Sequence, residues 1–283
     1  PVPARDEVSV EVRAASVSYM DLLMTAGGYQ LRPELPYVPG TDAAGYVVDV
    51  GSDVEGFSPG DPVIATGWHG AYAERMVAKH WRCNRIPAGI DMTAACTVAH
   101  AYSTAHYCLA ERAGLRAGET LLITGTAGGV GLATTDLGRM MGARVIAVIG
   151  DASKAEAVRR AGAAEVIDLR TQDLRARVKE LTEGRGVDVC VEMIGGEVFL
   201  SLARLMAWGG RLMPIGFTSG EVPKLAMNLP LLKNYSIVGV FTGAWVDREP
   251  ARSSAALDEL LAHVAAGRLS PRIDRVLPLE QVS

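Results

Sequence analysis

Four glycines cluster where a stiff apolar run meets a helical pattern, in the stretch LLITGTAGGVG at residues 121–131. The apolar run ends at Thr124, and the helical pattern begins near Val130. Glycine lets the backbone approach a ligand closely, and a helix N-terminus offers free N–H groups and a positive dipole end. This corner therefore suits the pyrophosphate of a dinucleotide. Its GxxGGxG spacing differs from the usual GxGxxG, and a tight turn without a ligand is the alternative. The glycines are Gly125, Gly128, Gly129 and Gly131.

The next apolar run ends in VIGDASK, residues 148–154, where the second part of a dinucleotide site is expected. An acid about 20 residues after the glycines usually holds the ribose 2′-hydroxyl of NAD, and Asp151 stands at that distance. Ser153 and Lys154 follow it, and a hydroxyl with an ammonium suits a 2′-phosphate. A helix N-cap and a solvated charge are the alternatives for these two residues. We predict NADPH rather than NADH, with Asp151 as the conflicting signal. The other expected contacts here are Ala127, Gly128, Gly129, Val130 and Gly150.

A parallel sheet is needed to position these segments, and the chain after residue 97 has the required pattern. Strands that are apolar throughout and alternate with helices favour a parallel sheet covered on both faces. Residues 98–242 are therefore predicted to form a doubly wound α/β domain that binds a dinucleotide. Apolar runs predict strands at 120–124, 144–149, 165–168, 187–193, 210–215 and 236–241. Helical patterns lie near 131–141, 153–161, 172–182 and 197–207.

Residues 1–97 have short strands and turn-rich connections instead. EVSVEVRAASV at residues 7–17 alternates apolar and polar residues, and AAGYVVDVG, DPVIAT and AYAERMVA predict further strands. This pattern predicts a small antiparallel barrel or sandwich. After residue 242, a helix is expected at 253–267 and a strand at 270–279. The chain starts without methionine and ends within this last pattern, so we expect trimming at both ends.

The bulk composition excludes several classes of protein. The 283 residues are 49% apolar and carry a net charge of −4, without the basic run expected of a nucleic-acid-binding protein. No apolar run approaches the length of a membrane span. The cysteines show neither CxxC pairing nor metal-ligand spacing, which predicts reduced thiols and a cytoplasmic protein. They are Cys83, Cys96, Cys108 and Cys190.

Nearly the whole chain resembles one known family. The marks are LPYVPGTDAAGYVVDVGSDVEGFSPGDPV, GAYAERMV, TGTAGGVGLA, GRGVDVCVEMIGG and GGRLMPIGF. They are similar to the medium-chain dehydrogenases/reductases, and among these to the zinc-free quinone oxidoreductases of the zeta-crystallin type. The resemblance implies a GroES-like barrel domain, to which residues 243–283 return, and a Rossmann domain, with the active site in the cleft between them. It also implies a homodimer paired through the edge segment SIVGVF, residues 236–241.

The resemblance further implies a reaction without zinc. Where zinc-dependent relatives carry metal ligands, this chain has Ser18, Thr41 and His100, and one possible ligand of three cannot hold zinc. Asp42, which replaces the glutamate of a GHE motif, is interpreted as structural, and so are His100 and His106. Without a metal the chemistry depends on NADPH, which gives hydride best to a quinone or an alkene conjugated to a carbonyl.

The remaining site residues also come from the resemblance. Tyr29 matches a tyrosine near the substrate of enoyl-thioester reductases, where a phenol is able to protonate an enolate; packing at the cleft edge is the alternative. Thr104 matches a threonine beside the nicotinamide, or it bonds the preceding helical turn. Further cofactor contacts are expected from Ser18, Gly216, Phe217, Phe241 and Thr242. The expected acceptor pocket is lined by Tyr19, Tyr29, Phe217, Phe241 and Trp245, unless the aromatic residues are interdomain core.

The sequence thus predicts an NADPH-dependent reductase of quinones or α,β-unsaturated carbonyls. An enoyl-thioester reductase is one alternative, and an NADPH-binding protein with a structural or sensing role is another. A fold alone does not separate these functions. The predicted partners are a small electrophilic acceptor and a second copy of the chain.

Overall fold

The structure, a computed structural model, describes residues 2–282 and divides into two compact units. Unit 1 takes the chain up to Ser103 and again from Gly243, and unit 2 spans Thr104–Thr242. The predicted domain limits at residues 97 and 242 stay a prediction, because compactness does not show that either unit folds by itself.

Unit 1 is built on a five-stranded antiparallel sheet with the order β4-β1-β2-β3-β5. Val8 and Val10 of β1 point into the core that β2 also lines, as the alternating pattern predicts. Predicted strands at the start of the chain are thus confirmed, although the fourth begins only at Arg75. The strands are β1 (Glu7–Ala15), β2 (Asp42–Val50), β3 (Pro62–Thr66), β4 (Arg75–Lys79) and β5 (Cys83–Arg85).

The C-terminal segment of the chain bonds back to this sheet through α10 (Pro250–Ala265). The side-chain Nδ2 of Asn84 on β5 donates to the backbone carbonyl oxygen of Ser254 at 3.0 Å and to the carboxylate of Asp258 at 2.8 Å. The strand predicted at 270–279 is wrong, because these residues pair with no strand among those described and Val276 is 69% exposed. A strand needs a neighbour for its backbone groups, and local alternation cannot supply one.

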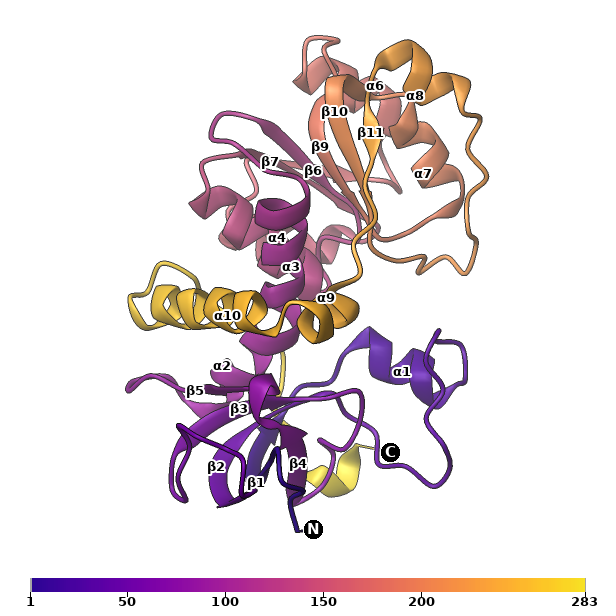
Figure 1. The fold of residues 1–283 in the computed structure, drawn as a ribbon. Coiled ribbons are helices and arrows are strands. Elements are labelled where there is room, and N and C mark those ends of the chain that lie inside the picture. The colour runs from indigo at the N-terminus through magenta and orange to yellow at the C-terminus, as the bar shows by residue number, and fades with distance from the viewer. Residues whose placement is uncertain (1, 283) are drawn as a thin grey trace. The chain divides into compact units, whose positions relative to one another are not determined.

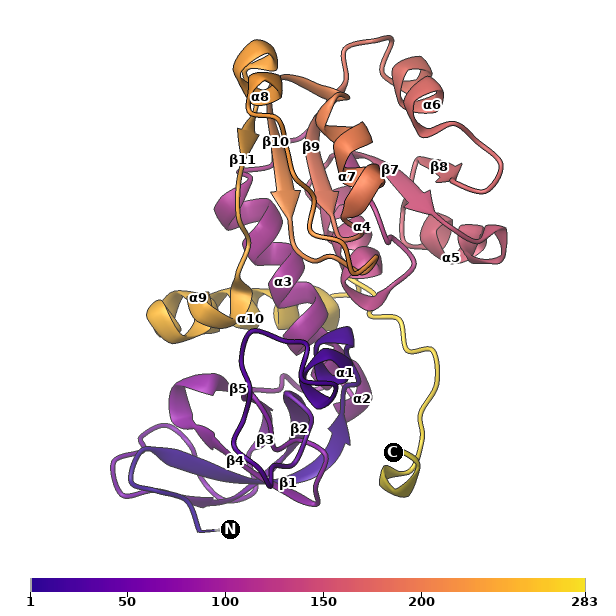
Figure 2. The same ribbon diagram turned by 90° about the vertical axis from the view of Figure 1, so that its right-hand side faces the viewer.

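Unit 2 is built on a six-stranded parallel sheet with the order β11-β10-β9-β6-β7-β8, so β11 and β8 form its edges (Figure 2). This is the strand order of a doubly wound dinucleotide-binding fold, which confirms the predicted fold class. The core strands are fully buried, as their unbroken apolar runs predict. The strands are β6 (Thr120–Ile123), β7 (Arg144–Ile149), β8 (Glu165–Asp168), β9 (Val187–Glu192), β10 (Met206–Pro214) and β11 (Ser236–Ile237).

Helices cover both faces of the parallel sheet. Figure 1 shows α4 on one face and α6 and α7 on the other. Two predicted boundaries are wrong: β10 begins at Met206 rather than at residue 210, and β11 has only two residues. The helices of unit 2 include α4 (Gly129–Met140), α5 (Ala155–Arg160), α6 (Leu174–Leu181), α7 (Gly196–Ala203) and α8 (Asn228–Lys233). No helix within residues 2–282 has the length and apolar character to cross a membrane.

A long helical run precedes the parallel sheet and contains two π-helical turns. It begins with α2 (Met92–Thr97), continues through the turn Val98–Tyr102 into α3 (Ser103–His106), and ends with the turn Tyr107–Arg112. π-Helical turns are rare and occur frequently at functional sites.

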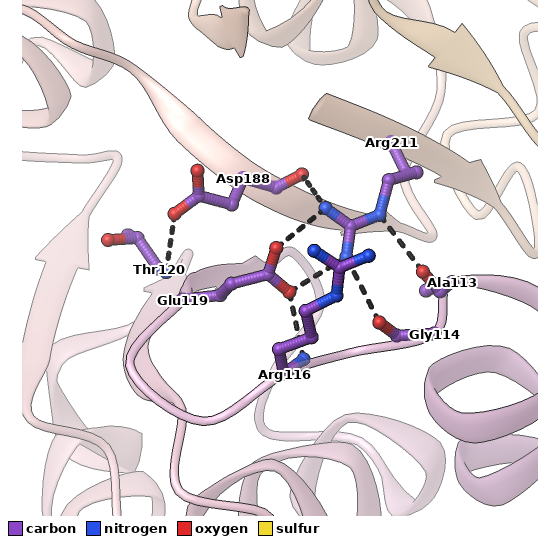
Figure 3. A network of polar contacts seen from close by, with 7 residues as sticks. All are labelled: Ala113, Gly114, Arg116, Glu119, Thr120, Asp188 and Arg211. Carbon is purple, nitrogen blue, oxygen red and sulfur yellow. Dashed lines mark hydrogen bonds and ion pairs between the residues drawn. The ribbon is translucent and has the colours of Figure 1, made fainter. Parts of the chain in front are cut away.

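A polar network fixes the start of the parallel sheet (Figure 3). The guanidinium of Arg211 on β10 donates to both carboxylate oxygens of Glu119, at 2.9 and 2.7 Å, and to the carbonyl oxygen of Ala113 at 2.9 Å. Asp188 of β9 accepts from the backbone N–H of Thr120 at 2.8 Å. The network therefore joins the segment before β6 to two neighbouring strands. The Arg211 guanidinium also holds the pKa of Glu119 below its ordinary value.

Candidate cofactor and acceptor site

The glycine corner leaves the start of α4 open to a ligand. Gly128 is the N-cap residue, and no side chain accepts from the first N–H groups of the helix. Both Gly128 and Gly129 are exposed, and a Cβ on Gly129 would meet nothing within 4 Å. A Cβ on Gly131, in contrast, would lie 2.6 Å from the carbonyl oxygen of Gly125, so the helix packs closely on the turn. These features suit a pyrophosphate held by backbone N–H groups.

Thr126 fixes one side of this corner. Its buried hydroxyl lies 2.6 Å from the carbonyl oxygen of Ile123 and accepts from the N–H of Val148 at 3.0 Å. It therefore joins β6 to β7 directly beneath the loop. The sequence shows Thr126 only as a residue that stands where the family often has a small alanine.

Glu192 fixes the other side, and sequence reasoning missed it. Its carboxylate is fully buried at the end of β9 and accepts from the hydroxyl of Thr124 at 3.0 Å. It also accepts from the N–H groups of Ile194 at 2.8 Å and Gly195 at 3.0 Å. Burial raises the pKa of Glu192. An acid within a buried strand, followed by two glycines, is the only signal that the sequence offers for it.

The segment after β7 decides the environment of a 2′-phosphate. Asp151 accepts from the N–H of Ser153 at 3.0 Å and from its hydroxyl at 2.8 Å, and the hydroxyl bond lowers the pKa of Asp151. Asp151 thus caps its own turn, and the Ser153 hydroxyl predicted to meet a phosphate is directed to Asp151. Lys154 and Arg170 are both exposed and near enough for their charges to act on Asp151. Arg170 follows β8 and was not identified from the sequence.

The predicted contacts Gly150 and Gly216 follow β7 and β10. They therefore lie at the carboxyl ends of the parallel strands, as the glycine corner does. Phe217 is 36% exposed there. Phe241 and Thr242 were predicted at the end of the sixth strand, which is wrong because β11 ends at Ile237 and α9 (Thr242–Arg248) begins at Thr242. The backbone N–H of Val238 still donates to Leu212 of β10, and residues 239–241 lie outside the sheet.

Four predicted contacts lie in unit 1 and one more lies on α3. Ser18 caps α1 (Tyr19–Thr25), and its hydroxyl donates to Asp21 at 2.6 Å. Tyr19 is half exposed, whereas Trp245 is 3% exposed and offers little surface to an acceptor. Burial raises the pKa of Tyr29, which keeps its phenol protonated as a proton donor requires.

Thr104 is 8% exposed on α3 in unit 2. Its proposed place beside the nicotinamide stays a prediction.

Thr41 and His100, two of the three positions that carry metal ligands in zinc-dependent relatives, lie beside Asp42 here. The hydroxyl of Thr41 donates to Oδ2 of Asp42 at 2.7 Å, and that of Ser16 donates to the same oxygen at 3.3 Å. His100 Nδ1 lies 3.7 Å from it. Within residues 2–282, no group of three or more histidine, cysteine or acidic side chains is arranged for a metal ion. These residues do not fit zinc, and the metal-free reaction stays a prediction.

Comparison with known proteins agrees with the two folds. An alcohol dehydrogenase GroES-like domain model matches residues 4–88, and a zinc-binding dehydrogenase model matches residues 129–262. The quinone oxidoreductase-like protein 2 homolog of Nematostella vectensis is 38% identical over 280 residues, which cover 98% of this chain and 76% of that protein. A stretch covering 75% of this chain is 40% identical to 6% of the erythronolide synthase EryA2 of Saccharopolyspora erythraea.

Solved structures share the same architecture. The structure of Escherichia coli quinone oxidoreductase complexed with NADPH aligns with a TM-score of 0.89 and 28% identity, covering 96% of this chain and 84% of that chain. The predicted family and both folds are thus confirmed. The chain belongs to the quinone oxidoreductase family of the medium-chain dehydrogenases/reductases.

Proposed function

We propose that this protein transfers hydride from NADPH to a quinone or an α,β-unsaturated carbonyl without a metal. The observation that carries the proposal is the open, uncapped start of α4 at Gly128 and Gly129, with Lys154 and Arg170 beyond the next two strands. Membership of the quinone oxidoreductase family and the NADPH complex of the Escherichia coli relative support it. NADPH, when bound, supplies the hydride.

The residues of unit 2 would bind and orient the cofactor. The N–H groups at Gly129 and Val130 would hold the pyrophosphate, whereas that of Gly128 donates to the carbonyl oxygen of Gly125 at 3.0 Å. The two cations would hold the 2′-phosphate. Gly216 and Thr104 would orient the nicotinamide. The described residues around Asp42 do not form a metal site, and a metal-free hydride transfer would need an acceptor that is already electron-poor.

The activity is tested by following NADPH oxidation with a panel of quinones, enones and crotonyl-type thioesters. We expect turnover with quinones or enones. Tight NADPH binding without turnover of any acceptor would instead favour a binding protein with a structural or sensing role.

The cofactor preference is tested separately with Lys154→Ala and Arg170→Ala. Each change should weaken NADPH binding by about tenfold, because each removes one charge-assisted contact of about 1.4 kcal/mol, and should leave NADH binding unchanged. Arg175→Ala, an exposed cation on α6, is the matched control. Equal losses for both cofactors would remove the 2′-phosphate assignment.

An enoyl-thioester reductase is the second candidate, favoured by the similarity to the erythronolide synthase and by the half-buried phenol of Tyr29, whose pKa burial raises. Preference for thioesters, together with a loss of about 100-fold in kcat for Tyr29→Phe, would support it. A quinone preference that survives Tyr29→Phe would count against it.

We also propose a homodimer through the edge of the parallel sheet at β11. Ile237 is 39% exposed there, and an apolar edge strand tends to pair with another chain. Sedimentation of the full chain should give twice the monomer mass, and Ile237→Lys should shift it toward the monomer.

A further inference from the structure

A buried carboxyl in unit 1 has no part in the function described so far. Asp42 stands at the start of β2 and is 4% exposed, in a sheet whose buried residues are mostly apolar. Its Oδ2 accepts hydrogen bonds from the hydroxyl groups of Thr41 and Ser16. Burial raises the pKa of Asp42, because removing a carboxylate from water disfavours its charged form.

His100 connects this carboxyl to solvent. Its Nδ1 lies 3.7 Å from Asp42 Oδ2, a separation typical of an ion pair, and its side chain is 25% exposed against 6% for Asp42. His100 lies within the π-helical turn Val98–Tyr102, whose extra residue redirects side chains relative to a regular helix. The turn thus directs an imidazole to a carboxyl that water scarcely reaches.

The cluster continues toward the residues predicted to meet the cofactor and the acceptor. Asp21 binds the Ser18 hydroxyl through Oδ2, and its other oxygen is buried without a hydrogen bond to any described residue. Tyr72 donates to the carbonyl oxygen of Ser16 at 3.2 Å. Burial raises the pKa of Tyr72, and the charge of Asp21 raises it further. The same charge also raises the pKa of Asp42. Ser18 therefore belongs to the same polar cluster as Asp42.

We propose that His100 supplies the proton that completes acceptor reduction, with Asp42 as the residue that positions its imidazole. The inference rests on the proposed reductase function. Hydride transfer leaves an enolate or hydroquinone oxyanion. The imidazolium N–H bond breaks, an O–H bond forms on the acceptor, and neutral His100 regains a proton from water. The Asp42 carboxylate stabilises the imidazolium and fixes the orientation of its ring.

The test compares kcat, KM and NADPH binding in the full chain. His100→Ala should lower kcat with an enone by about 100-fold. Added imidazole should raise the kcat of this variant by at least about tenfold, because the missing group is a proton donor. Asp42→Asn should lower kcat by about tenfold and leave KM within about twofold, because it acts only through His100. NADPH binding, measured by fluorescence, should not change in either variant.

His263→Ala is the matched control. His263 also lies near an acid of its own helix, Glu259, at 3.5 Å, but it stands on α10 outside the cluster. Its removal should leave kcat unchanged. An unchanged kcat in His100→Ala, a loss that imidazole does not restore, or a parallel loss of NADPH binding would each overturn the proposal.

A separate measurement distinguishes failure of this inference from failure of the proposed function. The charge of His100 lowers the pKa of Asp42, so His100→Gln should raise that pKa in a carboxyl ¹³C NMR titration, whether or not the protein turns over. An unchanged titration of Asp42 would show that the two groups do not interact and would overturn the pairing. If wild-type protein reduces no acceptor, the proton-transfer role fails with the reductase function.

Discussion

Asp42 in unit 1 and Glu192 in unit 2 are both buried carboxyls, but different partners surround them. Glu192 in unit 2 is fully buried and accepts from the hydroxyl of Thr124 and from two backbone N–H groups. Asp42 in unit 1 is almost as buried, yet its partners are two hydroxyls and a half-buried imidazole. Backbone donors hold a carboxylate in place, whereas hydroxyls and an imidazole are able to exchange protons with it.

The difference separates a structural acid from a functional one. Burial raises the pKa of both groups, so the direction of the shift does not distinguish them. Their donors do: removing Glu192 leaves fixed N–H groups without acceptors, whereas removing the charge of Asp42 leaves hydroxyls that are free to rotate. Four predictions sharpen or break this comparison.

The largest effect is expected at Glu192. Glu192→Ala should lower the free energy of unfolding by about 3 kcal/mol, because three buried donors lose their acceptor. Glu192→Gln retains one oxygen and should cost about 1 kcal/mol. Urea denaturation followed by circular dichroism measures both. A cost below about 1 kcal/mol for the alanine variant would contradict a structural role.

The next effect concerns Glu119, a partly buried acid of unit 2 that pairs with Arg211 (Figure 3). Arg211→Met should cost about 2 kcal/mol, because it leaves the Glu119 carboxylate, whose side chain is 19% exposed, without its bidentate partner. Arg160→Ala breaks the exposed pair with Glu156 and serves as the control. Exposed pairs contribute about 0–1 kcal/mol, so equal costs in the same urea experiment would refute the distinction.

The contributions of Glu192 and Glu119 to stability should depend on pH in opposite directions. The pKa of Glu192 is raised, so its contribution to stability is fully present below the ordinary value, about 4.3, and is lost as pH rises through the raised value. The pKa of Glu119 is lowered, so its contribution is present above about 4.3 and is lost as pH falls.

The measurement is the stability difference between wild type and each Glu→Gln variant across pH. Each unit of pKa shift corresponds to about 1.4 kcal/mol. Differences that change with pH in the same direction for both variants would contradict the assignment.

The smallest effect on stability is expected at Asp42. Asp42→Asn should change the free energy of unfolding at pH 7 by less than about 1 kcal/mol, because an amide oxygen still accepts from Thr41 and Ser16 and no buried charge remains. Thermal unfolding measures this change. Asp49→Asn, at an exposed position of the same strand, is the control. A loss as large as that of Glu192→Ala would make Asp42 structural and would end the contrast.

The sequence predicts most of the fold because its signals are local. Buried strands such as β6, β7 and β9 are largely apolar, and the glycine spacing places the turn before α4. It overestimates β11, because SIVGVF is almost entirely apolar but only two residues pair with β10. It also predicts a strand at 270–279 that has no neighbour among the described residues.

The candidate site is predictable only in part for the same reason. The loop from Gly125 to Gly131 and the turn with Lys154 lie next to recognisable strand ends. Arg170 and Glu192 escape notice, because their relevance depends on neighbouring strands that are distant in the chain.

The sequence by itself indicated the family through its resemblance to known members. It also predicted the parallel α/β fold, the strands of the first domain and the glycine corner, since periodicity and spacing act between residues that are close along the chain. Only the tertiary structure decided that Ser16, Thr41 and His100 converge on one buried oxygen of Asp42. Those residues come from three separate segments, and each alone is an ordinary polar side chain. Packing of β2 against its neighbours and the π-helical turn bring them together, because burial leaves the carboxyl no other partners than those the fold supplies.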